Sequence, residues 1–86
     1  MPIISLFFGI KITIYYDDHY PPHFHAEYNG NNALIDIINV TVIKSALPKR
    51  QLKLVLAWAE LHKDELMQNW ELSLNKEELI KIKPLQ

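Results

Sequence analysis

Hydrophobic and polar positions alternate along two stretches of the chain, and each alternation predicts a β-strand. From residue 8 to residue 16 the even positions are apolar, while the odd positions are small, polar or amphipathic. The alternation returns from His23 to Tyr28, where the polar face carries His23, His25 and Glu27. A period of two buries one face of each strand. Two short apolar runs are candidates for further strands: Ile3–Phe7, with Gly9 marking a turn after it, and Val40–Ile43.

A β-hairpin is predicted around Asn29-Gly30, because both residues tolerate a positive φ. The strand that follows is the apolar run Ala33–Ile38. A two-residue loop pairs Phe24 with Ile35, and a four-residue loop pairs Phe24 with Ile37. Either register places apolar side chains opposite apolar ones, so the assignment of the two faces does not depend on the turn length.

The polar face of this hairpin collects titratable groups. Asp36 lies opposite His23 in one register and opposite His25 in the other. If Tyr16 on the preceding strand pairs with Phe24, that strand adds three side chains to the same face: Lys11, Thr13 and Tyr15. Imidazole, carboxylate, hydroxyl and ammonium groups are then expected side by side.

The second half of the chain carries a helical pattern. Apolar residues recur at three- and four-residue spacings after Leu47-Pro48, and proline suits the first turn of a helix. The pattern continues to about Leu74 as one helix, or breaks near His62 with Asp64 capping a second helix. Isoleucines alternate with lysines over residues 80–83, which indicates a short edge strand. The expected fold is α+β, with three to four mostly antiparallel strands packed on one long helix or on two consecutive helices.

Size and composition set limits on the class of protein. Eighty-six residues, 49% of them hydrophobic and 22% charged, predict one globular domain over residues 1–86. The absence of cysteine favours a cytoplasmic protein. The apolar N-terminus lacks the basic start of a signal peptide and is interrupted by Lys11, so no membrane segment is expected. The net charge of −1 gives no overall attraction to nucleic acid, and the small core favours homo- or hetero-oligomers.

The segment from residue 17 to residue 28 is the densest in chemistry-bearing groups. His23 and His25, two residues apart on one strand face, could bind a divalent metal such as zinc. In a catalytic interpretation without a cofactor, Asp36 orients one of these histidines as a general base, and Lys11 or Arg50 stabilises developing charge. The alternative is that both imidazoles form ordinary hydrogen bonds across the sheet.

A second group of candidate residues could bind a partner or an anion. Lys49, Arg50 and Lys53 cluster in the first turn of the helix, where the macrodipole disfavours cations by about 0.3 to 1 kcal/mol each. This local cost favours an anionic partner, although simple solvation is the alternative. The remaining candidates are polar groups near the histidines and at the helix break: Asp17, Asp18, His19, Glu27 and His62.

Several short motifs resemble those of one family of small bacterial proteins. They are the Tyr-Asp-Asp-His segment at 16–19, Pro-His-Phe-His-Ala-Glu-Tyr at 22–28, Leu-Pro-x-Arg at 47–50, Leu-His-x-Asp-Glu-Leu at 61–66 and Asn-Trp at 69–70. By these motifs the chain is similar to the domain-of-unknown-function 4160 family. The resemblance implies a second small protein encoded nearby, in a toxin–antitoxin-like pair. The leading hypothesis is therefore a protein-binding or regulatory component, and the alternative is a small hydrolase or ribonuclease.

Overall fold

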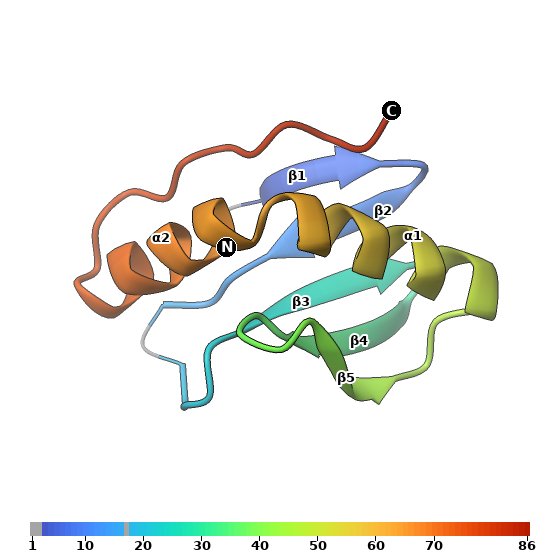
Figure 1. Cartoon of the computed structure of the whole chain (residues 1–86), viewed down its shortest axis with the longest axis horizontal. Helices are drawn as coiled ribbons and strands as arrows, with labels where there is room; N and C mark the ends of the chain where they lie inside the picture. The colour runs from blue at the N-terminus through green and yellow to red at the C-terminus, as the bar shows by residue number, and fades with distance from the viewer. Residues whose placement is uncertain (1–2, 17) are drawn as a thin grey trace.

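A computed structural model describes residues 3–16 and 18–86 and confirms the α+β fold. One antiparallel sheet carries its strands in sequence order: β1 (Ile3–Phe7), β2 (Ile10–Thr13), β3 (His23–Tyr28), β4 (Asn31–Asp36) and β5 (Thr41–Ser45). Helices α1 (Lys49–Leu61) and α2 (Lys63–Leu74) lie across one face of this sheet (Figure 1). Both short apolar runs become strands, so the sheet has five strands rather than the three to four expected. Neither helix combines the length and the apolar character that crossing a membrane requires.

The central hairpin adopts the register predicted for a two-residue loop. Asn29 and Gly30 both have positive φ, at 50° and 81°, as a two-residue turn of this kind requires. Phe24 therefore pairs with Ile35. The preceding strand differs from the prediction in register. β2 ends at Thr13, so Tyr16 lies outside it, and Ile12 pairs with Ala26 of β3. The shift is an even number of residues, so the polar face predicted for β2 is retained.

The core lies between the sheet and the helices. It is built from the inward positions of all the strands except β5, together with one stripe from each helix. Trp58 of α1 is fully buried, and its ring packs against Phe7 and Phe24 with centroids 5.2 and 5.8 Å away. Trp70 of α2 is also buried and lies beneath the start of β3. Both tryptophans are core residues, as their helical spacing indicates.

The helical region divides into two helices at His62. This residue ends α1 with its backbone N–H donating to the carbonyl oxygens of Trp58 and Ala59, and α2 begins at the next residue. Asp64 lies in the first turn of α2 instead of capping it through its side chain. The acidic group still complements the positive end of the helix dipole at that position.

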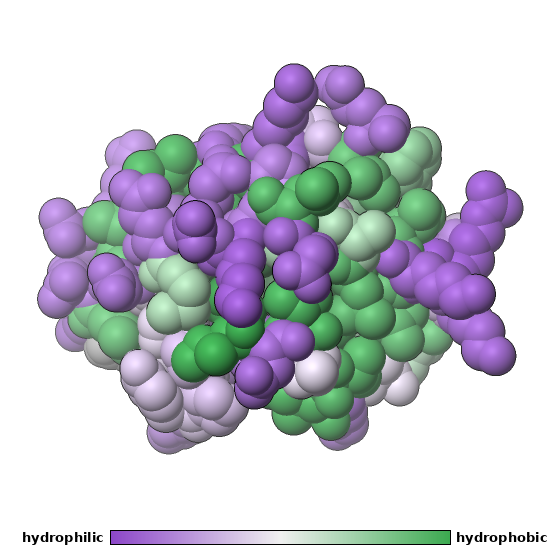
Figure 2. All heavy atoms as spheres, in the orientation of Figure 1, coloured by the Kyte–Doolittle hydropathy of each residue, from purple (hydrophilic) through white to green (hydrophobic). Residues whose placement is uncertain are grey.

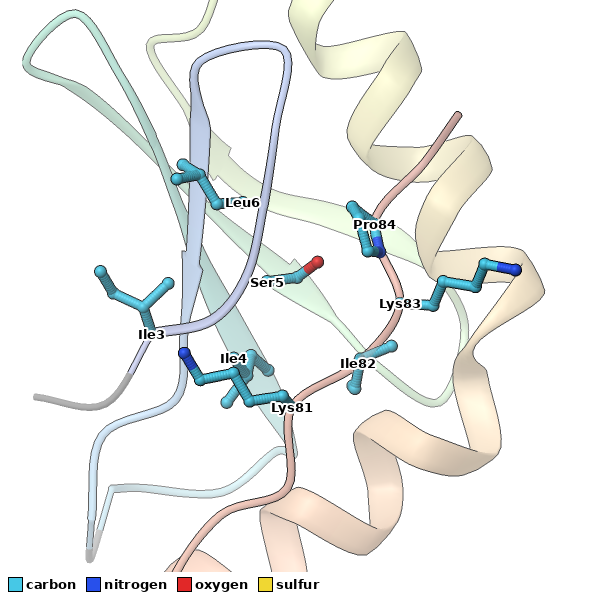
Figure 3. Close-up of a pocket in the computed structure, with 8 residues that line it drawn as sticks. All are labelled: Ile3, Ile4, Ser5, Leu6, Lys81, Ile82, Lys83 and Pro84. Atoms are coloured by element: carbon cyan, nitrogen blue, oxygen red, sulfur yellow. The ribbon is translucent and has the colours of Figure 1, made fainter.

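The C-terminal segment is not the edge strand that its alternating isoleucines indicate. Residues 75–86 leave α2 and run beside β1, where the Ile82 N–H donates to the Ile4 carbonyl oxygen at 2.7 Å (Figures 1 and 3). Side chains replace the missing ladder: the Asn69 amide bonds both the N–H and the carbonyl of Ile80, each at 2.8 Å. The Trp58 indole N–H donates to the Lys83 carbonyl at 2.9 Å. These bonds hold the segment against the β1 edge.

Candidate functional site

The connection between β2 and β3 brings Asp18 against both histidines of β3. Asp18 Oδ2 lies 3.0 Å from His23 Nε2 and 3.3 Å from His25 Nε2. The three side chains are largely buried, with 22%, 10% and 20% of their surfaces exposed for Asp18, His23 and His25. We refer to these three residues as the Asp–His–His cluster.

The cluster is held by the backbone on both sides. His23 Nδ1 lies 2.8 Å from the carbonyl oxygen of Pro21, so this ring nitrogen carries a proton and donates it. The His19 N–H donates to Asp18 Oδ1 at 2.8 Å, which leaves Oδ2 turned towards the imidazoles. His23 and His25 point the same way because they are two residues apart on one strand.

Burial and hydrogen bonding set the charges of the cluster. Burial lowers the pKa of His25 and outweighs the Asp18 carboxylate, which raises it, so the net pKa falls below the ordinary 6.5. Burial raises the pKa of Asp18, but the hydrogen bonds from the His19 N–H and from both histidines bring it below its ordinary 3.8. At neutral pH the cluster therefore contains a neutral His25 and an ionised Asp18.

Acidification should destabilise the metal-free chain through this cluster. Because the pKa of His25 is lower in the folded chain, the unfolded chain binds a proton first as the pH falls below 6.5, and stability drops. The stability contributed by Asp18 persists above 3.8 and is lost as the pH falls through its lower folded pKa. The urea concentration at the midpoint of unfolding, measured with a chelator present, should decrease as the pH is lowered from about 7.5 to about 5. His25→Gln should weaken this dependence, and an unchanged dependence would contradict the assignment.

Aromatic rings and two surface hollows surround the cluster. Tyr15 packs edge-on against His25 with ring centroids 4.0 Å apart, and Trp70 lies 5.3 Å from His23. One hollow of about 280 Å³ is lined by cluster residues together with Leu34 and Ile43. A second hollow, of about 310 Å³, is also lined by His25, together with Tyr15 and Lys44. The cluster is thus fixed in position and still accessible from the surface.

Asp36 does not pair with the histidines as the strand register led us to expect. It lies opposite His23 in the β3–β4 ladder, but its Oδ1 accepts the Asn39 N–H at 3.1 Å, within the turn after β4. At the end of a strand, a carboxylate accepts a hydrogen bond from the nearest free amide of the turn more easily than from an imidazole across the ladder. Asp18 takes the place predicted for Asp36.

The other candidate residues lie outside the cluster. Glu27 is exposed and lies 4.0 Å from Lys11, a surface ion pair that contributes little. His62 Nδ1 donates to Glu65 at 2.5 Å, at the break between the helices. His19 is exposed and takes part through its backbone N–H. Asp17 lies outside the described residues.

The predicted basic group begins α1. All three of its residues, Lys49, Arg50 and Lys53, are exposed. Among the described residues no side chain caps this end of α1, and its first turn contains no acidic residue. Figure 2 shows hydrophilic side chains projecting from the end of the molecule where α1 begins, with apolar surface next to them.

Comparison with known proteins identifies a family. A family model described as "Domain of unknown function (DUF4160)" matches residues 9–71, which is most of the chain. The chain belongs to the DUF4160 family. No curated protein and no solved structure matches it.

In this DUF4160 chain, the sequence pattern indicates His23 and His25 as site residues but does not indicate Asp18 as their common partner. The signal in the sequence was an acidic residue, Asp18, in the loop that leads directly into a strand with a His-x-His motif. An acidic residue in a loop ordinarily forms part of a turn. Only the path of residues 18–23 in the structure shows that the loop folds back and brings Asp18 against β3. A carboxylate with two imidazoles can transfer protons, bind an anion when protonated, or bind a metal ion.

Proposed function

We propose a function that rests on strand β5, which is the open edge of the sheet within the described residues. This strand pairs with β4 on one side, and all five of its residues are exposed, including Val42 at 41% and Ile43 at 48%. The opposite edge, β1, has the C-terminal segment beside it. Exposed edge strands with apolar side chains are templates for an additional strand from another chain.

We propose that this protein is a binding or regulatory component of a two-protein, toxin–antitoxin-like module that works in the cytoplasm. Its partner is the second small protein of the pair, which adds an extended segment to β5. The exposed β5 edge is the observation that carries this proposal. Main-chain hydrogen bonds would supply affinity, and contacts to Val42 and Ile43 would select the sequence of the added strand.

Charge indicates the chemistry of the partner segment. Four of the nine cationic residues, Lys44, Lys49, Arg50 and Lys53, fall within ten positions that contain no acid. Within residues 3–16 and 18–86, none of these four forms an ion pair. The segment that pairs with β5 should therefore carry acidic side chains, and its binding should weaken as salt increases.

Replacing Ile43 with glutamate should weaken the complex with the protein encoded by the neighbouring gene. The change removes the burial of one aliphatic side chain, worth about 1.5 to 3 kcal/mol, and adds repulsion against an acidic partner. The dissociation constant should rise at least about tenfold, as measured by titration calorimetry with purified proteins. Ile80→Glu is the matched control, because Ile80 is equally exposed but lies on the C-terminal segment. Equal losses in both variants, or no complex with the wild type, would contradict the proposal.

A small hydrolase or ribonuclease is the second candidate, favoured by the Asp–His–His cluster beside a surface hollow. In this case Asp18 orients a neutral imidazole that acts as general base, and it stabilises the imidazolium that forms when this ring accepts a proton. Purified protein should then cleave RNA, and Asp18→Asn and His25→Ala should each abolish cleavage while Asp36→Asn retains it. Absence of cleavage by the wild type would remove this candidate.

A further inference from the structure

The three donor atoms of the Asp–His–His cluster converge on one point. All of them lie within 4.8 Å of one another, and the two contacts of Asp18 Oδ2 measure 3.0 and 3.3 Å. A tetrahedral zinc ion with bonds of about 2.0–2.1 Å separates its ligand atoms by roughly 3.3 Å. Two of the three separations therefore already match those around a single bound ion.

Asp18 Oδ2 is a single acceptor that faces both imidazoles of the cluster. His23 Nδ1 donates to the Pro21 carbonyl, so Nε2 is the ring nitrogen that faces the Asp18 carboxylate. His25 Nε2 faces the same oxygen. A proton on each Nε2 satisfies these two contacts separately, whereas one metal ion in place of those protons would bind both imidazoles and the carboxylate together.

The surroundings of the cluster are those of a metal site. Metal-binding histidines commonly donate their second ring N–H to a backbone carbonyl, as His23 does to Pro21. Metal-binding carboxylates are themselves held by hydrogen bonds, as Asp18 Oδ1 is by the His19 N–H. Both contacts come from the backbone of the loop before β3, so they orient the ligands before an ion arrives.

We propose that Asp18, His23 and His25 bind one first-row divalent transition metal ion, with Zn²⁺ the ion best suited to two imidazoles and one carboxylate. Imidazole nitrogen is a poor ligand for Mg²⁺ and Ca²⁺, which prefer oxygen. Three protein ligands leave at least one coordination position for water or for a ligand from outside. The adjoining hollow of about 280 Å³ gives that position access to the surface.

β5 carries none of the three proposed ligands, although Ile43 of β5 lines the adjoining hollow. The metal site would serve either function: a metal-bound water is a nucleophile for hydrolysis, and a metal ion fixes the loop before β3 in a binding protein. A test of metal binding therefore does not depend on the test of the partner.

The full chain, stripped with a chelator and dialysed, should bind one Zn²⁺ per chain in titration calorimetry and melt at a higher temperature when loaded. Replacing Zn²⁺ with Co²⁺ should give visible absorption bands whose intensity reports four- or five-coordination. Excess Mg²⁺ should not compete. Loss of an outer hydrogen-bond partner lowers metal affinity about 10- to 100-fold, so removal of a ligand should cost at least as much.

Asp18→Asn and His25→Ala should each show this loss of zinc affinity. Asp18→Asn preserves the size of a loop side chain, so it tests the site even if His25→Ala unfolds. His19→Ala is the matched control: it removes a neighbouring exposed imidazole and retains the backbone N–H that holds Asp18. The proposal is overturned if the wild type binds no stoichiometric zinc, if Asp18→Asn binds as tightly as the wild type, or if His19→Ala loses as much affinity.

Discussion

Replacing Trp58 with alanine should lower the free energy of unfolding by about 3 to 5 kcal/mol. The side chain is fully buried and joins β1, β3 and α1 through its contacts with Phe7 and Phe24. Its indole N–H also holds the C-terminal segment through the Lys83 carbonyl. Domains of this size are stable by only about 5 to 15 kcal/mol, so much of the stability depends on this residue. Urea denaturation monitored by far-ultraviolet circular dichroism measures the change.

Two variants show which part of the Trp58 side chain matters. Trp58→Phe retains a ring in the core and removes the hydrogen bond to Lys83, so its cost should be clearly smaller. Leu61→Ala changes an exposed residue at the end of the same helix, 71% accessible, and should stay within about 0.5 kcal/mol of the wild type. A loss for Trp58→Ala no larger than that for Leu61→Ala would contradict the core described above.

Replacing Asn69 with leucine should cost about 2 kcal/mol and release the C-terminal segment. Asn69 is buried, and its amide satisfies both the N–H and the carbonyl of Ile80. Leucine has a similar volume but no polar atom, so both groups lose their partner. Hydrogen exchange should then accelerate at Ile80 and Ile82 and at the neighbouring β1 edge, and proteases should cleave residues 75–86 sooner.

Gln68→Leu provides the control for this change. It makes the same type of substitution at the preceding, exposed position of α2. Its stability and its C-terminal exchange should match those of the wild type. Equal release of the segment in both variants would show that the Asn69 amide is not what holds it.

Much of the fold follows from local rules. The alternation along β3 and the Asn29-Gly30 turn determine the central hairpin, since a turn with two positive φ values and an apolar face permit few registers. The tryptophans were placed correctly in the core because helical spacing directs them to one face. The C-terminal segment was predicted wrongly, because the bonds that hold it come from Asn69 and Trp58, which are distant in sequence.

The site was predictable only in part. A period of two places His23 and His25 on one face, and this needs no tertiary information. The position of Asp18 depends on how the loop before β3 folds back, which no periodic pattern encodes. Strand register placed Asp36 correctly in the ladder, but it did not reveal that the Asn39 amide binds its carboxylate.

Amide hydrogen exchange of β5 tests the proposed function most directly. The chain is measured alone and in the presence of the proposed partner, the second small protein of the pair. In the free chain, exchange should be faster on β5 than on β3, because β5 is the open edge and β3 is central. We expect partner binding to slow exchange on β5 while β3 changes little. Unchanged exchange on β5 in a saturated complex, or protection confined to another surface, would contradict partner binding at this edge.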